Sequence, residues 1–254
     1  GSESVGIASQ VITLTRSGGS ELTASTAVTI ELTNIKNSTT AGSTGTYSIQ
    51  TTTGADVAID QDTAVNADTI TFAAANKMEV TTQPSSSTVA GVAFTQQPVV
   101  TIQDEFGNTV TDSTLTVTAS LQTGDGTLSG TAAVAASSGV VTYSGLSMNL
   151  TGTDKVLRFT QSSLSNTTVD TSPAFTITFA AANKLGVTTQ PSSSTVAGVA
   201  FSQQPVVAIQ DEFGNTVTNS SLSVTASLQT GDGSLSGTVS VAASSGVATY
   251  SGLS

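Results

Sequence analysis

The feature that most limits the fold of this chain is a long internal repeat. Residues 72–147 align without a gap with residues 179–254, at an offset of 107 positions, and only 11 of the 76 aligned positions differ. Sequences this similar are expected to fold alike, which indicates tandem units that each contact their neighbours. The total length of 254 residues leaves room for two or three small domains.

Each copy consists of short segments in which apolar and polar residues alternate. Leu115, Val117, Ala119 and Leu121 fall on one face, with the period of two that a half-buried strand requires. Turn-forming residues separate these segments, as in "EFGN" and "TGDG". The strands expected in the first copy are residues 77–82, 89–94, 98–104, 114–122, 139–144, 155–161 and 174–179.

Composition supports the same interpretation. Hydrophobic residues make up 37% of the chain, which is enough for packed cores, and β-branched residues are frequent. Long runs of Ala, Leu, Glu and Lys at helical spacing are missing. Seven or eight short strands per repeat fit a two-layer sandwich. The predicted fold class is therefore all-β, with tandem immunoglobulin-like β-sandwiches as the architecture.

Two phrases of the first copy carry a resemblance to a known group of proteins. These are "GVAFTQQPVVTIQDEFGNTVTDSTLTVTASLQTGDGTLSG" and "GVVTYSGLS", which both recur in the second copy with a few substitutions. They resemble the immunoglobulin-like repeats of large bacterial and archaeal surface proteins, similar in plan to invasin, intimin and filamin repeats. The resemblance covers residues 73–254. It implies the fold, and it implies roles as diverse as spacers, adhesins, sheath components and enzyme appendages.

The pattern divides the chain into three parts. Residues 1–72 form an N-terminal β block, part of a sandwich, with strands expected at residues 10–15, 27–35 and 45–53. Val28, Ile30 and Leu32 share one face of the second of these strands. The block looks like the closing half of a different β-sandwich. We call residues 73–179 repeat 1 and residues 180–254 repeat 2.

Repeat 2 lacks counterparts of the last two expected strands of repeat 1, residues 155–161 and 174–179. An apolar inner face and a strand edge would then be left in contact with water. We expect strands from outside this segment to complete repeat 2. Covalent continuation of a longer chain is the favoured source, and donation of strands by a neighbouring copy is the alternative.

Charge and cysteine content exclude several classes of function. The formal net charge is −11 and charged residues make up 9%, so neither nucleic acid nor an anionic membrane surface is an expected partner. Without cysteine there are no disulfides and no thiol chemistry. No stretch of 18 apolar residues is present, so no membrane insertion is expected in this segment.

No catalytic, cofactor or metal site is predicted. There is no His, and the acidic pair Asp104–Glu105, repeated as Asp211–Glu212, is interpreted as a turn in which Gly107 takes a positive φ. The segment 179–184 contains no carboxylate, so packing is expected to stiffen the junction between repeats. A cluster of acids could hold calcium but is better explained as a solvated strand edge; it comprises Asp56, Asp60, Asp62 and Asp68.

Aromatic residues and sequons carry little functional information. Tyr143, Tyr250, Phe94 and Phe201 are interpreted as core residues rather than sugar-binding platforms. Possible glycosylation sequons begin at Asn37, Asn149, Asn166 and Asn219. The predicted core residues are Val80, Val100, Ile102, Val117, Leu121, Val140 and Leu157 in repeat 1 and Val187, Val207, Ile209, Val224 and Leu228 in repeat 2.

These observations lead to a non-catalytic function. We expect a structural repeat protein of an extracellular prokaryotic filament, sheath, S-layer or surface stalk, with copies of itself or the continuation of a longer chain as partners. The alternative is the stalk region of a cell-surface adhesin whose binding module lies outside this segment. An accessory part of a secreted enzyme is a third possibility. All three place the chain outside the cell.

Overall fold

The structure is a computed structural model that describes residues 2–8, 11–17, 36–52 and 58–254. Every regular element of these residues is a β-strand, which confirms the all-β prediction. None of them belongs to a helix long and apolar enough to span a membrane. The backbone divides into two compact units, residues 1–38 and residues 39–254.

The N-terminal block contributes antiparallel strand pairs. In the first unit β1 pairs with β2, and in the second unit β3 pairs with β6 and β4 with β5. The expected strand at residues 27–35, with Val28, Ile30 and Leu32, lies outside the described residues. The strands of this block are β1 (Ser2–Ala8), β2 (Val11–Ser17), β3 (Gly42–Ser43), β4 (Tyr47–Thr52), β5 (Ala58–Val65) and β6 (Thr69–Ile70).

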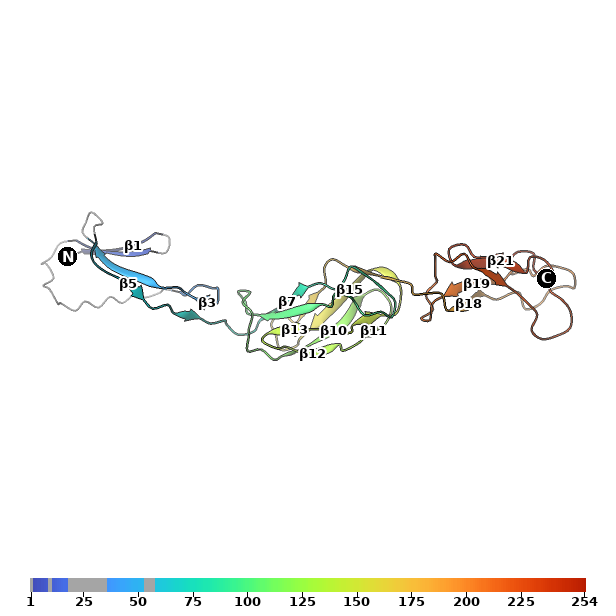
Figure 1. Cartoon of the computed structure of the whole chain (residues 1–254), viewed down its shortest axis with the longest axis horizontal. Helices are drawn as coiled ribbons and strands as arrows, with labels where there is room; N and C mark the ends of the chain where they lie inside the picture. The colour runs from blue at the N-terminus through green and yellow to red at the C-terminus, as the bar shows by residue number, and fades with distance from the viewer. Residues whose placement is uncertain (1, 9–10, 18–35, 53–57) are drawn as a thin grey trace. The chain divides into compact units, whose positions relative to one another are not determined.

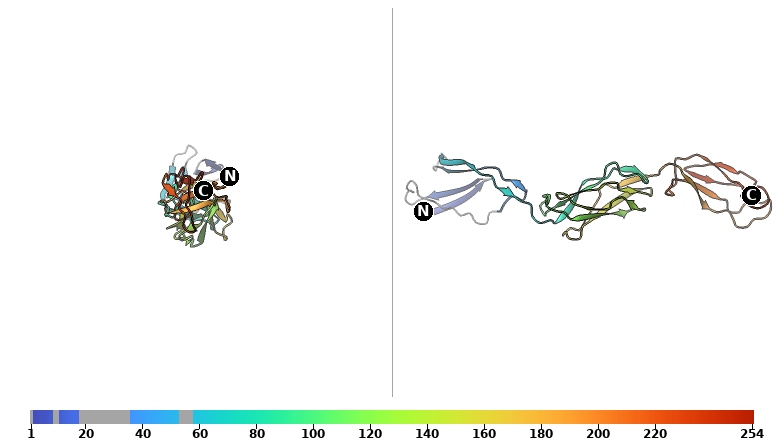
Figure 2. Two further views of the ribbon diagram at one scale, coloured as in Figure 1. Left: turned by 90° about the vertical axis from the view of Figure 1, so that its right-hand side faces the viewer. Right: turned by 60° about the horizontal axis from the view of Figure 1, so that its bottom comes forward.

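Repeat 1 has two main sheets and one short strand pair, and its buried residues form one core (Figures 1 and 2). One sheet has the order β12-β10-β15-β17-β8, with β16 paired to β15, and the other has the order β13-β9-β7. The short strands β11 and β14 pair with each other. The bounds are β7 (Lys77–Thr82), β8 (Ser87–Val89), β9 (Val99–Gln103), β10 (Thr116–Thr123), β11 (Leu128–Ser129), β12 (Ala133–Ala135), β13 (Val140–Thr142), β14 (Ser147–Met148), β15 (Gly152–Thr160), β16 (Thr168–Asp170) and β17 (Phe175–Thr178).

The expected strands of repeat 1 agree with these elements, with one exception. Residues 89–94 were expected to form a strand, but the structure has β8 at Ser87–Val89 followed by a turn. Gly91 in that turn has a φ of +77°, a conformation that favours glycine over residues with a side chain. The "VAG" of this segment is therefore the end of a strand and the start of a turn.

Repeat 2 has fewer strands than repeat 1, and its strand β20 is shorter than the corresponding β10. Its sheet β18-β19-β22 corresponds to β7-β9-β13 of repeat 1, and β20 pairs with β21 as β10 does with β12. The bounds are β18 (Lys184–Thr189), β19 (Val206–Gln210), β20 (Ser223–Thr225), β21 (Ser240–Ala242) and β22 (Val247–Thr249).

Most predicted core residues are buried. Val100, Ile102, Val117 and Leu157 of repeat 1 are each 0% exposed, and Val207, Ile209 and Val224 of repeat 2 are at most 8% exposed. Val80 and Leu121 are half-buried and pack against the core of repeat 1. As predicted, the aromatic rings of Phe94, Tyr143 and Tyr250 are also buried, while Phe201 is half-buried.

The prediction of burial was only partly right for Val140 and was wrong for two residues of repeat 2. Val140 is only half-buried, because the register of β13 turns the next residue, Val141, fully into the core. Val187 and Leu228 of repeat 2 are exposed, at 52% and 47%. Both lie on the face of repeat 2 that no described strand covers, although their counterparts Val80 and Leu121 are partly covered in repeat 1.

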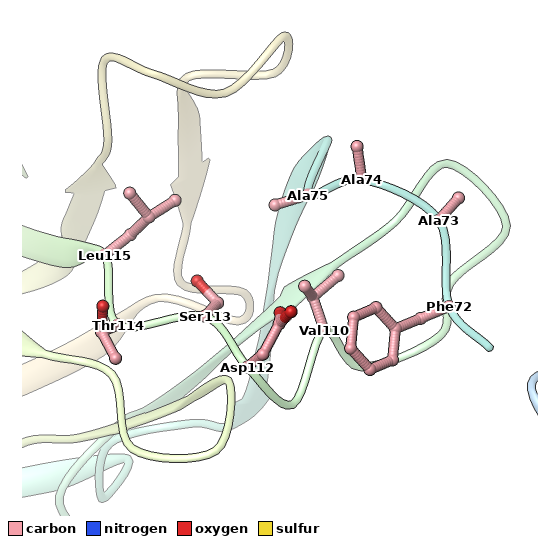
Figure 3. Close-up of a pocket in the computed structure, with 9 residues that line it drawn as sticks. All are labelled: Phe72, Ala73, Ala74, Ala75, Val110, Asp112, Ser113, Thr114 and Leu115. Carbon is pink, nitrogen blue, oxygen red and sulfur yellow. The ribbon is translucent and has the colours of Figure 1, made fainter.

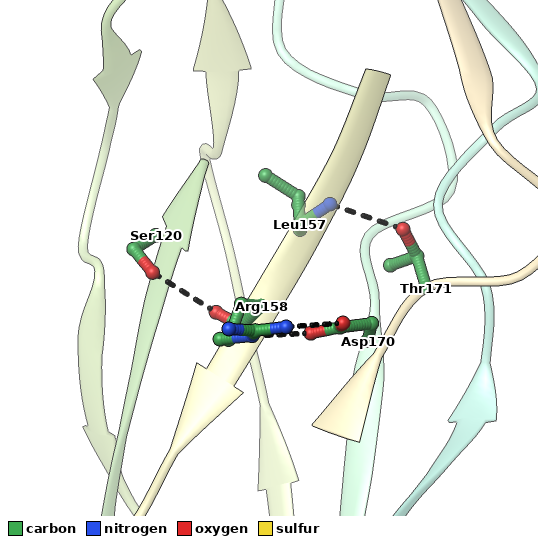
Figure 4. A network of polar contacts seen from close by, with 5 residues as sticks. All are labelled: Ser120, Leu157, Arg158, Asp170 and Thr171. Atoms are coloured by element: carbon green, nitrogen blue, oxygen red, sulfur yellow. Dashed lines mark hydrogen bonds and ion pairs between the residues drawn. The ribbon is translucent and has the colours of Figure 1, made fainter. Parts of the chain in front are cut away.

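A bidentate ion pair links β15 to β16 (Figure 4). Arg158 donates from Nε to Asp170 Oδ1 at 2.8 Å and from one terminal nitrogen to Oδ2 at 2.7 Å. The hydrogen bonds from Arg158 lower the pKa of Asp170, against an opposing effect of burial. Next to it, the N–H of Leu157 donates to Thr171 Oγ1 at 3.1 Å. These contacts hold the last strands of repeat 1 to one another.

Candidate functional site: the clasp between consecutive modules

The acidic turn of each repeat begins with a buried carboxylate. In repeat 1 this is Asp104, which is 0% exposed and follows directly after β9. Its Oδ1 accepts hydrogen bonds from the N–H groups of Phe106 (3.0 Å) and Asn108 (2.8 Å). Gly107 has a φ of +94°. The predicted capped turn with a positive φ at Gly107 is therefore confirmed.

The second oxygen of Asp104 holds the start of the repeat. Oδ2 accepts hydrogen bonds from the N–H of Ala73 (2.9 Å) and from Nδ2 of Asn108 (2.8 Å). In repeat 2, Asp211 makes the equivalent bonds with Ala180 (3.0 Å) and Asn215 (2.8 Å). The junction segments contain no acid of their own, but a carboxylate from a distant turn binds them. The expectation that packing stiffens the junction did not include this hydrogen bond.

The asparagine at the end of each turn reaches the preceding module. Nδ2 of Asn108 donates to the carbonyl of Thr39 (2.7 Å), and Oδ1 accepts from the N–H of Ala41 (2.9 Å). Asn215 does the same with the carbonyl of Asn149 (2.9 Å) and the N–H of Thr151 (2.9 Å). In both cases the two backbone groups are two residues apart. A carboxamide carries an NH2 group beside a carbonyl oxygen, so one N–H and the oxygen bind the preceding chain as a backbone peptide group does. The second N–H is left to donate to the aspartate of the same turn.

We call Asp104 with Asn108 the first clasp and Asp211 with Asn215 the second clasp. Each clasp fixes three pieces of chain: its own turn, the first residues of its repeat, and the backbone of the preceding module. The sequence alone did not reveal Asn108 and Asn215 as contact residues. The available signal was the unchanged "DEFGN" in both repeats, which was explained as a turn alone.

An aromatic contact accompanies the second clasp. Phe213 packs against the core of repeat 1 beside Gly91, where an added Cβ would lie only 2.2 Å from the ring. Gly91 therefore meets two requirements, its positive φ and the close approach of the ring. The counterpart of Phe213 at the first clasp is Phe106, which is 53% exposed. The two junctions thus share the hydrogen bonds and differ in this aromatic contact.

A shallow pocket of about 480 Å³ lies beside the first clasp, where Ala73 is one of its lining residues (Figure 3). The ring of Phe72 and the side chain of Val110 lie close together in it, with Asp112 beside them. A similar pocket in repeat 2 is lined by Phe179, Val217 and Asn219. Asn219 is the counterpart of Asp112, so the second pocket has an amide where the first has a carboxylate. Both pockets have an apolar lining, but they have no acid–base group in common.

The candidate metal-binding acids do not form a common centre in the part of the chain that is described. Asp62 and Asp68 are exposed, and Asp56 lies outside the described residues. Asp60 belongs to β5. No group of three acidic residues able to hold a metal ion is found among the described residues.

The sequons differ in accessibility. Asn37, Asn166 and Asn219 are exposed. Asn149 is half-buried, and its Oδ1 accepts a hydrogen bond from the N–H of Thr127 at 2.7 Å. Its side chain is thus occupied within repeat 1, next to the second clasp.

The two clasp carboxylates should make the free energy of unfolding depend on pH in the acidic range. Burial by itself would raise the pKa of Asp104, but hydrogen bonds from Asn108, Ala73 and Phe106 hold that pKa at about 2. The pKa of Asp211 is lowered by the same pattern of bonds, also against burial. Because the folded pKa lies below the unfolded value of about 3.9, these groups stabilise the fold above pH 4, and this contribution is lost as the pH falls towards 2.

Urea unfolding followed at a series of pH values between 2 and 6 tests this expectation. The variant Asp104→Asn should be less stable at pH 6 and show a flatter pH dependence below pH 4. Asp112→Asn is the matched control, because this exposed position is already asparagine (Asn219) in repeat 2. An unchanged pH profile in Asp104→Asn would contradict the assignment.

The geometry therefore defines a joint that binds polypeptide backbone. Searches of known protein families and of curated proteins found no match to this chain.

Proposed function

We propose that the chain is a structural repeat protein of an extracellular prokaryotic filament, sheath or surface stalk. The observation that carries the proposal is the recurrence of the clasp. Asn108 and Asn215 bind the preceding backbone through the same pair of hydrogen bonds, at two successive junctions. A joint encoded in both repeats fixes each module to its neighbour, as an element that transmits force or spaces other domains requires.

The two-sheet packing of repeat 1 supports immunoglobulin-like sandwiches as the module type. Its strands β8 and β17 pair in parallel, whereas the other pairs are antiparallel, and both sheets share one core. Low charge and abundant Ser and Thr suit an exposed surface outside the cell. The described pockets offer no convergent acid and base, so a non-catalytic role fits them best.

The alternative function is the stalk of a cell-surface adhesin, in which the same joints would space a separate binding module from the cell. Electron microscopy of the native assembly distinguishes the two. Regular polymers with a repeat that matches the module length support the filament, and single thin particles with a distinct tip support the adhesin. Particles with neither feature would contradict both.

A further inference from the structure

The two clasps bind segments that differ in how firmly they are held. We call the junction at the first clasp the first joint and the junction at the second clasp the second joint. The second clasp binds the carbonyl of Asn149 and the N–H of Thr151, which lie between β14 and β15 of repeat 1. The neighbouring Met148 is 0% exposed, and its carbonyl accepts a hydrogen bond from the N–H of Gly91 at 2.7 Å. The second clasp therefore binds backbone that is anchored in a packed module.

The segment that the first clasp binds has less support. Thr39 and Ala41 directly precede β3, which has only two residues and pairs only with β6 among the described strands. Both residues of β3, Gly42 and Ser43, are exposed. The same pair of hydrogen bonds therefore holds repeat 1 to a short two-stranded ladder at the first joint, and holds repeat 2 to a packed module at the second.

An aromatic ring strengthens the second joint but not the first. Phe213 is half-buried and packs against the core of repeat 1 next to Gly91. Its counterpart Phe106 is 53% exposed, although both rings belong to turns with the same sequence, "DEFGN". The preceding module, and not the turn, therefore determines whether the ring has an apolar partner.

A valine of repeat 1 adds a second apolar group to the second joint. Val89, the last residue of β8, lines the pocket of repeat 2 together with Phe179 and Val217. The equivalent pocket of repeat 1 is lined by residues 72–75, 110 and 112–115, so no described residue before Phe72 lines it. Within the described part of the chain, the apolar side chains that cross the second joint have no equivalent at the first.

The covalent connections of the two joints differ as well. At the second joint only Phe179 lies between the end of β17 and the residue that the clasp binds. The carbonyl of Thr178, the last residue of β17, also accepts a hydrogen bond from the N–H of Ala90 at 2.8 Å. At the first joint residues 71–72 lie between the end of β6 and the residue that the clasp binds. The second connection is therefore shorter and starts from a strand of the largest sheet of repeat 1.

We propose that the first joint is a hinge at residues 71–72 and that the second joint is stiff, so that repeats 1 and 2 move together. Domains that meet through a small polar interface are expected to move relative to each other, whereas apolar contacts restrict that motion. The clasp hydrogen bonds are common to both joints, so they do not cause the difference. The apolar contacts and the firmer support of the second joint cause it. This inference concerns two joints within the chain and does not depend on the proposed extracellular role.

Pairs of spin labels on the whole chain test the proposal. The chain has no cysteine, so cysteines introduced at exposed positions are the only sites that a thiol-reactive label modifies. Thr46→Cys with Thr116→Cys spans the first joint, and Thr116→Cys with Ser223→Cys spans the second; all three positions are exposed. Pulsed double electron–electron resonance should give a distance distribution that is about twofold broader, or more, across the first joint than across the second.

Matched variants identify the cause of the difference. Phe213→Ala should broaden the distribution across the second joint, whereas Phe106→Ala should leave the distribution across the first joint unchanged. Val89→Ser should also broaden the second distribution, and because Val89 is 39% exposed this change should not unfold repeat 1. Circular dichroism of each variant checks the fold. The proposal is overturned by equal widths across the two joints, by a second distribution that neither Phe213→Ala nor Val89→Ser broadens, or by a first distribution that Phe106→Ala broadens.

Discussion

Replacing Phe159 with alanine is expected to lower the free energy of unfolding of repeat 1 by about 3–5 kcal/mol. The side chain is 0% exposed, and its ring centroid lies 5.2 Å from that of Tyr143. Removing the ring leaves a cavity between the two sheets that neighbouring strands can fill only in part. Chemical denaturation followed by circular dichroism should show a lower midpoint with an unchanged denaturant dependence.

The control for this change is Phe106→Ala, which removes the same ring from a position that is 53% exposed. It should change the free energy of unfolding by about 1 kcal/mol or less. Similar losses in the two variants would mean that Phe159 is not part of the core that the structure describes.

The second large effect is expected for Asn215→Asp, an isosteric change in the second clasp. It removes the Nδ2 donor that binds the carbonyl of Asn149 and Asp211 Oδ2, and it places a second carboxylate 2.8 Å from the first. Asn215 is only 6% exposed, so solvent cannot compensate. We expect a loss of about 2–4 kcal/mol, measured by chemical denaturation at neutral pH.

Asn219→Asp provides the matched control for the charge. It is the same chemical change four residues further on, at an exposed position where repeat 1 already has Asp112. Its stability should lie within about 0.5 kcal/mol of the parent chain. Equal losses in the two variants would mean that the clasp contributes nothing beyond net charge.

The strands of repeat 1 could be predicted from sequence because each is short, alternates, and is bounded by turn residues. Leu115, Val117, Ala119 and Leu121 do lie on one face, and the face is turned inward as expected. The turn at Asp104 could also be predicted, since its residues act locally on their own backbone. Both predictions depend on residues that are only a few positions apart in the sequence.

The clasp and the short β20 could not be predicted in the same way, because they depend on groups far away in the chain. Asn215 binds backbone 66 residues earlier, and no property of "DEFGN" indicates that distance. Residues 116–123 and 223–230 differ at one position, yet only the former are a strand throughout. The local sequence around Val187 and Leu228 therefore predicts that they are buried, but no described strand covers them in repeat 2.

The way in which the clasp asparagine binds has a consequence for the order of modules. Its two hydrogen bonds to the preceding module go to main-chain atoms, so these bonds do not recognise the side chains of the bound segment. Thr39 to Ala41 and Asn149 to Thr151 share only this backbone arrangement, and the same residue type holds both. The clasp hydrogen bonds can therefore be kept when modules of unrelated sequence are exchanged, inserted or duplicated upstream of a repeat, whereas the contact of Phe213 with Gly91 is specific to repeat 1. Retention of such backbone bonds is the condition under which chains of this kind lengthen by gene duplication.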